Sequence, residues 1–390
     1  MILRKNLTRL DAVSLKLTER LIKFPQFRLK IHGNRLVSLD SCAFILFYAL
    51  SKYTGVFMRC VLWLIFIFHS FQVTAIDESN FDRIYNSSVG PYYNQFPLKF
   101  HFYHDNSSKK FPYKFIKKGS KDLFVILPGK GEPLERYAET LYDFKNIDRD
   151  ILIIQFRGQG YSSRSTRNPE KTYIRKYNDV VSDLHSIFSD LEIRKNYESI
   201  TLIGHSMGAH FGLRYEQEYN MFDVLILNSP MIGVLDEKDT QKNYLLAKLL
   251  IGVGMGKAFI PGGRGWRDYA FEENDITHSL VRYKNFRRIN VENPATRLGS
   301  VTVRWVYEAI KSERELFKYS QTIMKPILIF QAGKDVVVSN EKQDMYCDNL
   351  PNCEMIRVEN SMHNFLQETD DYREQYLNIL FEKLNLGMRD

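Results

Sequence analysis

Short runs that are apolar at almost every position alternate with amphipathic stretches through most of the chain. Three runs are the clearest: residues 122–127 (DLFVIL), 151–156 (ILIIQF) and 326–331 (PILIFQ). Such runs are typical of strands that are buried on both faces. Strands that alternate with helices imply a mostly parallel sheet with helices on both faces. This alternation predicts an α/β fold built on one large central sheet.

Weaker patterns complete the predicted order of elements. We expect further strands at residues 98–104, 113–117, 199–203, 224–228 and 354–358, and helices at 134–144, 173–191, 207–219, 341–350 and 369–384. The alternation stops after Pro230 and resumes at residue 326. The interruption is mostly helical in pattern and too long for a loop. We interpret it as an inserted cap over the carboxyl edge of the sheet, where such folds bind their ligands.

A possible nucleophile lies between a predicted strand and a predicted helix. The sequence there is Gly204-His205-Ser206-Met207-Gly208. A G-x-S-x-G sequence in this context is typical of a nucleophile elbow, in which a strained turn exposes the serine hydroxyl. Gly204 and Gly208 leave room for backbone segments that a side chain would displace. We therefore predict that Ser206 is a catalytic nucleophile.

Serine needs a general base that a third group orients. His363 is the only one of nine histidines that follows the last predicted strand, and Asp335 directly follows the strand at 326–331. The order Ser206, Asp335, His363 is the chain order of an α/β-hydrolase triad. The alternative for Asp335 is an exposed turn aspartate. His205 and His210 lie beside the nucleophile, and we expect them to be packing residues.

The oxyanion of the reaction needs two N–H donors. The backbone of Met207, at the start of the helix after the elbow, is one candidate. The second is the backbone of Lys130, in the loop Pro128-Gly-Lys-Gly-Glu132 after the central strand. This loop lacks the G-x-x-x-x-G-K-[ST] pattern of a phosphate-binding loop. No spacing of histidines or cysteines suggests a metal site.

These segments resemble the monoacylglycerol lipase and lysophospholipase branch of the α/β-hydrolases. PGKGEP stands in the place of the branch's HG-x-GEH loop, with Pro128 where a histidine is usual, and FRGQGYSS, GHSMG, QAGKDVVV and SMHNFL resemble its other motifs. Residues 274–279, 282–285 and 303–310 of the cap are similar to the bacterial L-two-type lysophospholipases. The resemblance covers about residues 95–385. Asn364 replaces the glutamate that usually follows the catalytic histidine.

The resemblance implies the α/β-hydrolase fold, the triad Ser206, Asp335 and His363, and no cofactor. It implies a two-step cleavage of the acyl ester of a lysophospholipid through an acyl-enzyme. Three alternatives remain: a monoacylglycerol lipase or carboxylesterase, a serine aminopeptidase, and a catalytically silent binding protein with the same fold.

The cap suggests two further hypotheses about the substrate. Apolar residues 245–259 would form an acyl tunnel, a membrane-touching lid or a buried helix. Four basic side chains would attract phosphate headgroups or belong to a solvated helix face; they are Arg282, Lys284, Arg287 and Arg288.

The first 75 residues differ from the rest. Met58-Arg59, the apolar run 60–68 and Val73-Thr-Ala75 are typical of a signal peptide at 58–75, with a membrane anchor or a buried helix as alternatives. Residues 1–57 carry no domain signature, and we interpret them as a non-native extension before a start at Met58. The remaining boundaries are a first core part at 76–230, a cap at 231–320 and a second core part at 321–390. We expect an exported or membrane-associated protein.

Cysteine usage and charge agree with that location. Cleavage after Ala75 would leave only Cys347 and Cys353, either as a disulfide or as two free thiols. The net charge of +8 favours an anionic partner such as a membrane surface. The charge is spread along the chain and no nucleic-acid motif is present, so we expect no nucleic-acid partner.

Overall fold

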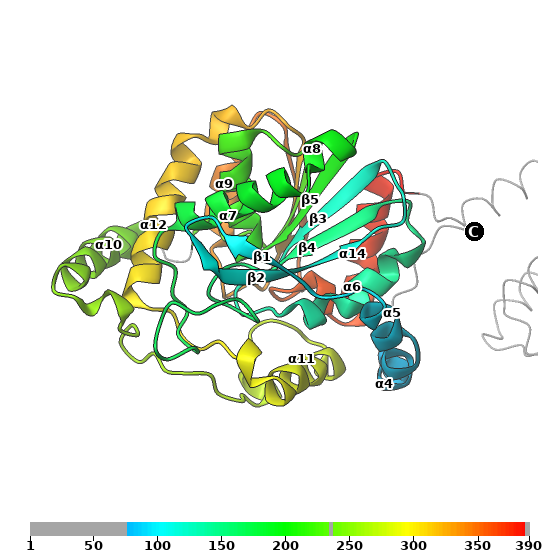
Figure 1. The fold of residues 1–390 in the computed structure, drawn as a ribbon, viewed down its shortest axis with the longest axis horizontal. Coiled ribbons are helices and arrows are strands. Elements are labelled where there is room, and N and C mark those ends of the chain that lie inside the picture. The colour runs from blue at the N-terminus through cyan, green and yellow to red at the C-terminus, as the bar shows by residue number, and fades with distance from the viewer. Residues whose placement is uncertain (1–75, 234–236, 387–390) are drawn as a thin grey trace, which may run out of the picture. The chain divides into compact units, whose positions relative to one another are not determined.

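The computed structural model describes residues 76–233 and 237–386, which contain an eight-stranded sheet in the order β1-β2-β4-β3-β5-β6-β7-β8 (Figure 1). The strands are β1 (Lys99–Tyr103), β2 (Asn106–Ile116), β3 (Asp122–Leu127), β4 (Asp150–Ile154), β5 (Ser199–His205), β6 (Val224–Asn228), β7 (Ile327–Ala332) and β8 (Cys353–Val358). β1 and β2 pair antiparallel, β2 pairs antiparallel with β4, and all later pairs are parallel. The predicted α/β architecture is confirmed.

Helices connect the strands. They are α4 (Phe81–Ile84), α5 (Gly90–Asn94), α6 (Ala138–Asp143), α7 (Tyr177–Asp190), α8 (Ile193–Asn196), α9 (Met207–Tyr219), α10 (Glu237–Gly252), α11 (Leu280–Glu292), α12 (Val303–Lys318), α13 (Asn340–Asp348) and α14 (Asp370–Lys383). The helix expected at 134–144 is instead a 3-10 turn, Leu134–Tyr137, followed by the short α6. The helical turns between residues 78 and 94 were not predicted, because four- or five-residue elements are too short to show a periodicity.

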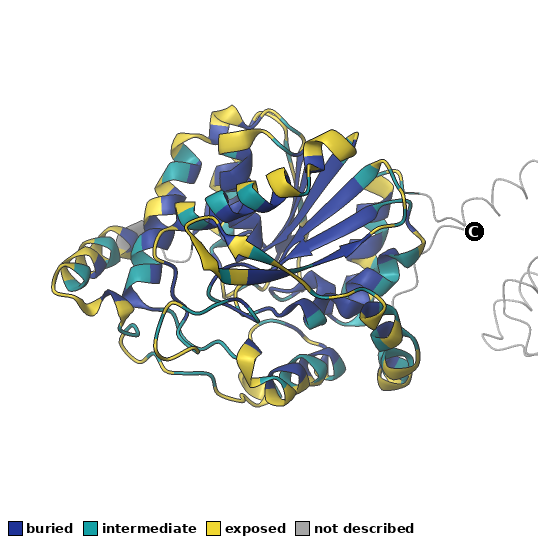
Figure 2. Ribbon diagram, in the orientation of Figure 1, coloured by how far each residue is buried: buried dark blue, intermediate teal, exposed yellow. Residues whose placement is uncertain are grey.

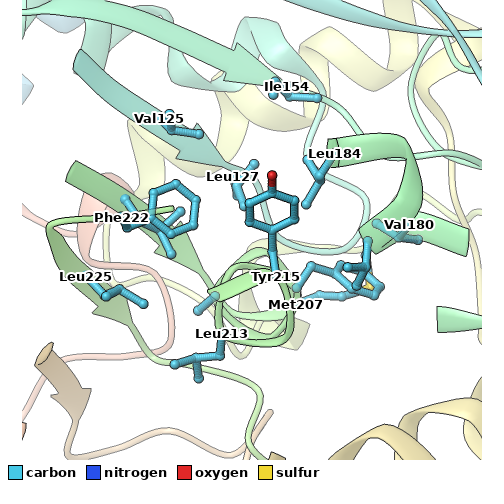
Figure 3. Packing of buried hydrophobic residues seen from close by; sticks show 14 of the residues in the cluster. Val125, Leu127, Ile154, Val180, Leu184, Met207, Leu213, Tyr215, Phe222 and Leu225 are labelled. Atoms are coloured by element: carbon cyan, nitrogen blue, oxygen red, sulfur yellow. The ribbon is translucent and has the colours of Figure 1, made fainter. Parts of the chain in front are cut away.

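The alternation of side chains along β3 divides the core into two layers. Leu123, Val125 and Leu127 belong to one buried cluster, and Phe124 and Ile126 belong to the other. Figure 3 shows the first layer, where Val125 and Leu127 pack with side chains of α7 and α9. The second layer contains buried residues of α6 and α14. Helices on both faces explain why the central strands β3 to β7 are almost entirely buried (Figure 2), whereas the edge strands β1 and β8 are partly exposed.

The segment between β6 and β7 leaves the carboxyl end of β6, and its described residues include the helices α10, α11 and α12. α12 packs against α10 and also contacts α7 and α9 of the core (Figure 1). α11 lies beside the 3-10 turn Leu134–Tyr137. The buried stripe of α12 includes Trp305, Ala309 and Leu316. Two of the inserted helices are thus in contact with core elements that come much earlier in the chain.

A disulfide joins Cys347, near the end of α13, to Cys353, the first residue of β8, with 5.4 Å between their Cα atoms. The two thiols are therefore paired rather than free. The predicted signal peptide at 58–75 and the extension at 1–57 lie outside the described residues. Within residues 76–233 and 237–386, no helix is both long enough and apolar enough to cross a membrane.

Candidate active site

Ser206 occupies a sharp turn between β5 and α9, with φ of 51° and ψ of −116°. A non-glycine residue rarely adopts a positive φ, so the surrounding structure must hold it there. The Ser206 amide donates to Asn228 O at 2.9 Å, and the Met231 amide donates to Ser206 O at 3.0 Å. Both partners lie at or just beyond the carboxyl end of β6, which fixes the strained turn.

The two glycines of the motif are required by close packing. A Cβ on Gly208 would lie 1.9 Å from Leu127 O, and a Cβ on Gly204 would lie 2.6 Å from the Cα of Ala209. Either contact is shorter than atoms tolerate, so a side chain would push the elbow away from the end of β3. The sequence pattern therefore has a local steric cause.

The structure brings Asp335 and His363 into direct contact, with 2.7 Å between Asp335 Oδ2 and His363 Nδ1. The other carboxylate oxygen accepts from the amides of Val337 and Val338, at 2.8 and 3.1 Å. A carboxylate that only accepts places the imidazole hydrogen on Nδ1 and leaves Nε2 free to take a proton. This is the arrangement that a histidine base requires.

Burial lowers the pKa of His363, and the hydrogen bond and negative charge of Asp335 oppose that change. The net effect is a pKa below the ordinary value of 6.5, so the ring is neutral at neutral pH. Ser206 and His363 line the same cavity. No hydrogen bond joins Ser206 Oγ to His363 among the described residues; such contacts often form only when substrate binds.

Two backbone amides are the predicted donors to an oxyanion. Met207 is the first residue of α9, so its N–H has no partner within the helix. In the loop after β3, Gly129 N donates to Glu132 Oε2 and Gly131 N donates to Gln159 Oε1. The Lys130 amide between them has no acceptor within the described part of the chain. The oxyanion role of Lys130 and Met207 remains a prediction that this geometry favours.

Glu132 lies at the centre of the hydrogen bonds of the site. From the sequence it was considered only as a member of the loop 128–132. Its buried carboxylate contacts five donors: Gly129 N (2.6 Å), Tyr137 Oη (2.6 Å), Asn364 Nδ2 (2.8 Å), His205 Nδ1 (3.0 Å) and Arg136 Nη1 (3.2 Å). Burial alone would raise the pKa of Glu132, but the contacts with His205 and Arg136 hold it well below its usual range. The glutamate of the PGKGEP segment is the sequence feature that could have indicated this role of Glu132.

Three of the donors to Glu132 come from separate parts of the site. Gly129 belongs to the predicted oxyanion loop, His205 precedes the predicted nucleophile, and Asn364 follows the predicted base. His205 also contacts the carbonyl oxygen of His363 through Nε2, at 3.2 Å. The expectation that His205 only packs is therefore incomplete. His210, by contrast, is held by Met231 O and Ser312 Oγ in the core.

Ser206 and His363 line a cavity of about 600 Å³. The segment between β6 and β7, called the insertion below, also contributes to its lining. Its aromatic lining comes from the insertion and comprises Trp266, Tyr269, Tyr283, Phe286 and Trp305. Two arginines, Arg136 and Arg287, also line it. A wall that combines aromatic rings with cations suits a ligand with an apolar part and an anionic part.

Two hypotheses about the insertion are wrong. Residues 245–259 do not line the cavity, and Leu245, Leu249 and Val253 are more than half exposed, which excludes both an acyl tunnel and a fully buried helix. Arg282 does not face a headgroup either. It is 1% exposed and pairs with Glu139 and Asp370, each at 2.9 Å. These contacts attach α11 to α6 and α14.

The three other basic residues of α11 differ in position. Arg287 lines the cavity, whereas Lys284 and Arg288 are exposed and lie outside it. In the part of the chain that the structure describes, no three His, Cys, Asp or Glu side chains are grouped as ligands for a metal ion.

The chain is similar in sequence to known proteins. The family model described as "Serine aminopeptidase, S33" matches residues 118–370. A probable lysophospholipase L2 of Haemophilus influenzae is 29% identical over 315 residues, which cover 80% of this chain and 99% of that protein. Lysophospholipase L2 of Escherichia coli is 29% identical over 280 residues, covering 67% of this chain and 80% of that protein.

Solved structures show the same fold at low sequence identity. A soluble variant of monoglyceride lipase from Saccharomyces cerevisiae aligns with a TM-score of 0.57 and 18% identity, over 74% of this chain and 94% of that chain. A thermostable carboxyl esterase from Bacillus coagulans aligns with a TM-score of 0.59 and 14% identity, over 74% and 98%. The expected fold is confirmed by these neighbours.

Proposed function

The chain belongs to the serine aminopeptidase S33 family of α/β-hydrolases, and from this premise we propose that it releases a fatty acid from lysophospholipids. It is a carboxylic ester hydrolase of the lysophospholipase and monoacylglycerol lipase branch. The observation that carries the proposal is the joint position of the strained Ser206 and the Asp335–His363 pair at one cavity.

The proposed reaction is a two-step acyl transfer. His363 Nε2 takes the proton of Ser206 as the hydroxyl oxygen attacks the ester carbonyl, and Asp335 stabilises the imidazolium. The amides of Lys130 and Met207 hold the tetrahedral oxyanion. When the tetrahedral intermediate collapses, the glycerol oxygen of the headgroup leaves and takes the proton from His363. The acyl group stays on Ser206 as an acyl-enzyme. Water then attacks by the same route and releases the fatty acid.

The choice of substrate rests on the relatives and on the cavity. The match to the lysophospholipase L2 relative from Haemophilus influenzae extends over nearly all of that protein. The aromatic lining suits an acyl chain, and the two arginines suit a phosphate. An aminopeptidase would need a free carboxylate near Ser206 for the substrate's ammonium group. Among the acids that line the cavity, Glu132 is surrounded by five donors and Glu273 pairs with Arg267, which leaves the exposed Asp275 as the candidate for that role within the described residues.

Contact with a membrane surface is part of the proposal. α10 and the residues after it expose apolar side chains, namely Leu245, Leu246, Leu249, Val253 and Met255. Lys242, Lys248 and Lys257 are exposed in the same segment. Apolar side chains flanked by lysines are typical of surfaces that insert into the headgroup region of an anionic bilayer. This surface would hold the enzyme where its substrate is found.

Export across a membrane is also proposed. The Cys347–Cys353 disulfide supports it, because disulfides persist in oxidising compartments. Mass spectrometry of the mature protein tests the proposal. A first residue at or near Ile76 would agree with cleavage of a signal peptide, whereas a native chain that retains residues 58–75 would contradict cleavage.

The experiment that tests the activity is fatty-acid release by the full-length chain. Lysophosphatidylethanolamine and monoacylglycerol with the same acyl chain are compared, with Ser206→Ala as the blank. We expect faster release from the lysophospholipid. A preference for monoacylglycerol would make the protein a neutral-lipid esterase with the same catalytic residues, and the absence of release from either lipid would contradict the proposal.

A further inference from the structure

Two arginines approach the catalytic cavity from different parts of the fold. Arg136 belongs to the 3-10 turn Leu134–Tyr137 just after the oxyanion loop, and Arg287 belongs to α11 of the insertion. Both line the cavity that Ser206 and His363 line. Their side chains are 5% and 13% exposed. Cations that are this buried beside a nucleophile require a reason, because desolvation of a charge is costly.

The guanidinium group of Arg136 is only partly satisfied by the protein. Its Nε donates to Gln367 Oε1, and its Nη1 lies 3.2 Å from Glu132 Oε1. Its plane lies over Phe286, with 3.9 Å from Cζ to the ring centre. Its Nη2 is buried and has no hydrogen-bond partner within the described residues. A buried unpaired N–H is unfavourable, so the guanidinium group retains hydrogen-bonding capacity that the described residues do not use.

Arg287 is oriented by two hydrogen bonds that leave part of its N–H donors unused. Its Nε donates to Asp268 Oδ1 at 2.7 Å, and its Nη2 donates to the carbonyl of Arg267. The group also lies 4.7 Å from the ring centre of Trp266. An arginine offers five N–H donors, and Nη1 makes no hydrogen bond in the described part of the chain. The side chain is therefore oriented but not saturated.

The charges of Arg136 and Arg287 also favour a bound anion. Burial lowers the pKa of Arg136, Glu132 opposes that change, and the like charge of Arg287 lowers the pKa further. The two cations are thus near enough to repel one another. The carboxylate beside Arg136 is shared with four other donors. An anion bound between the two guanidinium groups would relieve this repulsion and accept their remaining hydrogen bonds.

We propose that Arg136 and Arg287 form a subsite for the phosphodiester of a lysophospholipid headgroup. The inference rests on the proposed function and names the residues that would give it specificity. Guanidinium groups match phosphate oxygens in geometry and charge. In a lysophospholipid a glycerol unit separates the ester from the phosphate, so both groups of one molecule fit within the same cavity. Binding would also join the core to α11 of the insertion.

The test compares Arg287→Gln with Arg288→Gln in the full-length protein. Arg288 is the next residue of the same helix but is exposed and lies outside the cavity, so it controls for loss of charge. For Arg287→Gln, kcat/KM on lysophosphatidylethanolamine should fall about 10-fold or more, because charge-assisted hydrogen bonds are lost. The value on monoacylglycerol should change less than about 3-fold, and Arg288→Gln should change neither.

Arg136→Lys is the second variant, since it keeps the charge beside Glu132 but removes the forked donor. Its loss on the lysophospholipid should exceed its loss on monoacylglycerol, where a smaller loss is also expected because Arg136 contacts Glu132, and thermal unfolding verifies that it folds. Equal losses on both lipids in Arg287→Gln, or no loss in that variant, would overturn the subsite. The wild-type preference between the two lipids tests the proposed function separately, so the two failures are distinguishable.

Inhibition of p-nitrophenyl butyrate hydrolysis separates a headgroup site from a site for free phosphate. Glycerophosphoethanolamine should inhibit the wild-type protein competitively, with an inhibition constant about 10-fold weaker in Arg287→Gln. Inhibition by inorganic phosphate without inhibition by glycerophosphoethanolamine would overturn the assignment to a lipid headgroup. So would equal inhibition constants in the two proteins.

Discussion

Asn364 Nδ2 donates to Glu132 Oε1 at 2.8 Å, although the two residues are 232 positions apart in the chain. The contact joins the loop of the predicted base to the loop of the predicted oxyanion hole. Glu132 also accepts from Gly129 N and His205 Nδ1. One buried carboxylate therefore joins three segments, through the backbone of Gly129 and the side chains of His205 and Asn364. Asn364 stands where relatives of the resembled branch usually have glutamate, and here it can donate to a carboxylate because it is an amide.

Ser206→Ala tests the nucleophile. Loss of the hydroxyl should lower kcat roughly 10⁴–10⁶-fold, as deletion of a triad serine does in other serine hydrolases. Labelling by a fluorophosphonate probe should also disappear, while the melting temperature should not fall. Wild-type rates of ester hydrolysis in Ser206→Ala would exclude the assignment.

The pH dependence of kcat/KM reports the state of His363. The ring acts as a base only when neutral, so activity should rise with pH as the imidazolium loses its proton. Because burial lowers the pKa of His363, the midpoint of this rise should lie below pH 6.5. Asp335→Asn should move the midpoint lower still and reduce kcat about 10⁴-fold. A wild-type midpoint above 6.5 would contradict the assigned environment.

Glu132→Gln should weaken both stability and catalysis. The substitution leaves His205 and Arg136 without their carboxylate, and breaking a buried charge pair costs about 3–5 kcal/mol. We expect a lower free energy of unfolding in urea, and a reduced kcat with little change in KM. Glu272→Gln, which alters an exposed acid, is the control and should change neither quantity. An unaltered kcat in Glu132→Gln would show that the carboxylate does not position the site.

Arg282→Leu should destabilise the protein without changing substrate preference. Removal of the cation leaves Asp370 without its ion-pair partner and leaves Glu139 with only the longer contact to Arg373, at a cost of about 3–5 kcal/mol. The ratio of kcat/KM values for lysophospholipid and monoacylglycerol should stay at the wild-type value in the folded fraction. Arg288→Leu, at an exposed position of the same helix, should cost less than about 0.5 kcal/mol. A selective loss on the lysophospholipid would restore a headgroup role for Arg282.

Leu249→Asp tests the membrane-facing role of α10. Leu249 is 66% exposed, so the substitution should not affect the core. Loss of an apolar side chain and addition of a negative charge should weaken adsorption to anionic vesicles about 10-fold, as measured by co-sedimentation. Met324→Asp alters a side chain with similar exposure outside the insertion helices and serves as the control. Equal adsorption of Leu249→Asp and the wild-type protein would exclude this surface.

Local patterns of the sequence were enough to predict the sheet, its longer helices and the elbow. The bounds of β3, α9 and β6 equal the predicted ranges, because these elements are buried and end at strong turn signals. Gly204 has a steric cause within the elbow, at Ala209, whereas Gly208 is required by the backbone of Leu127 at the end of β3, much earlier in the chain. Asp335 and His363 could be chosen from their places after the strands, since carboxyl ends of parallel strands meet at one edge.

Only the tertiary structure decided how distant side chains are paired. The burial of Arg282, the exposure of Leu249 and the access of Arg287 to the cavity depend on the rotation and packing of α10 and α11. The contacts of Glu132 with Asn364 and His205 join loops that no local pattern relates. Periodicity reports which face of an element is apolar, but the partner of a buried charge is set by long-range packing, where desolvation makes pairing necessary.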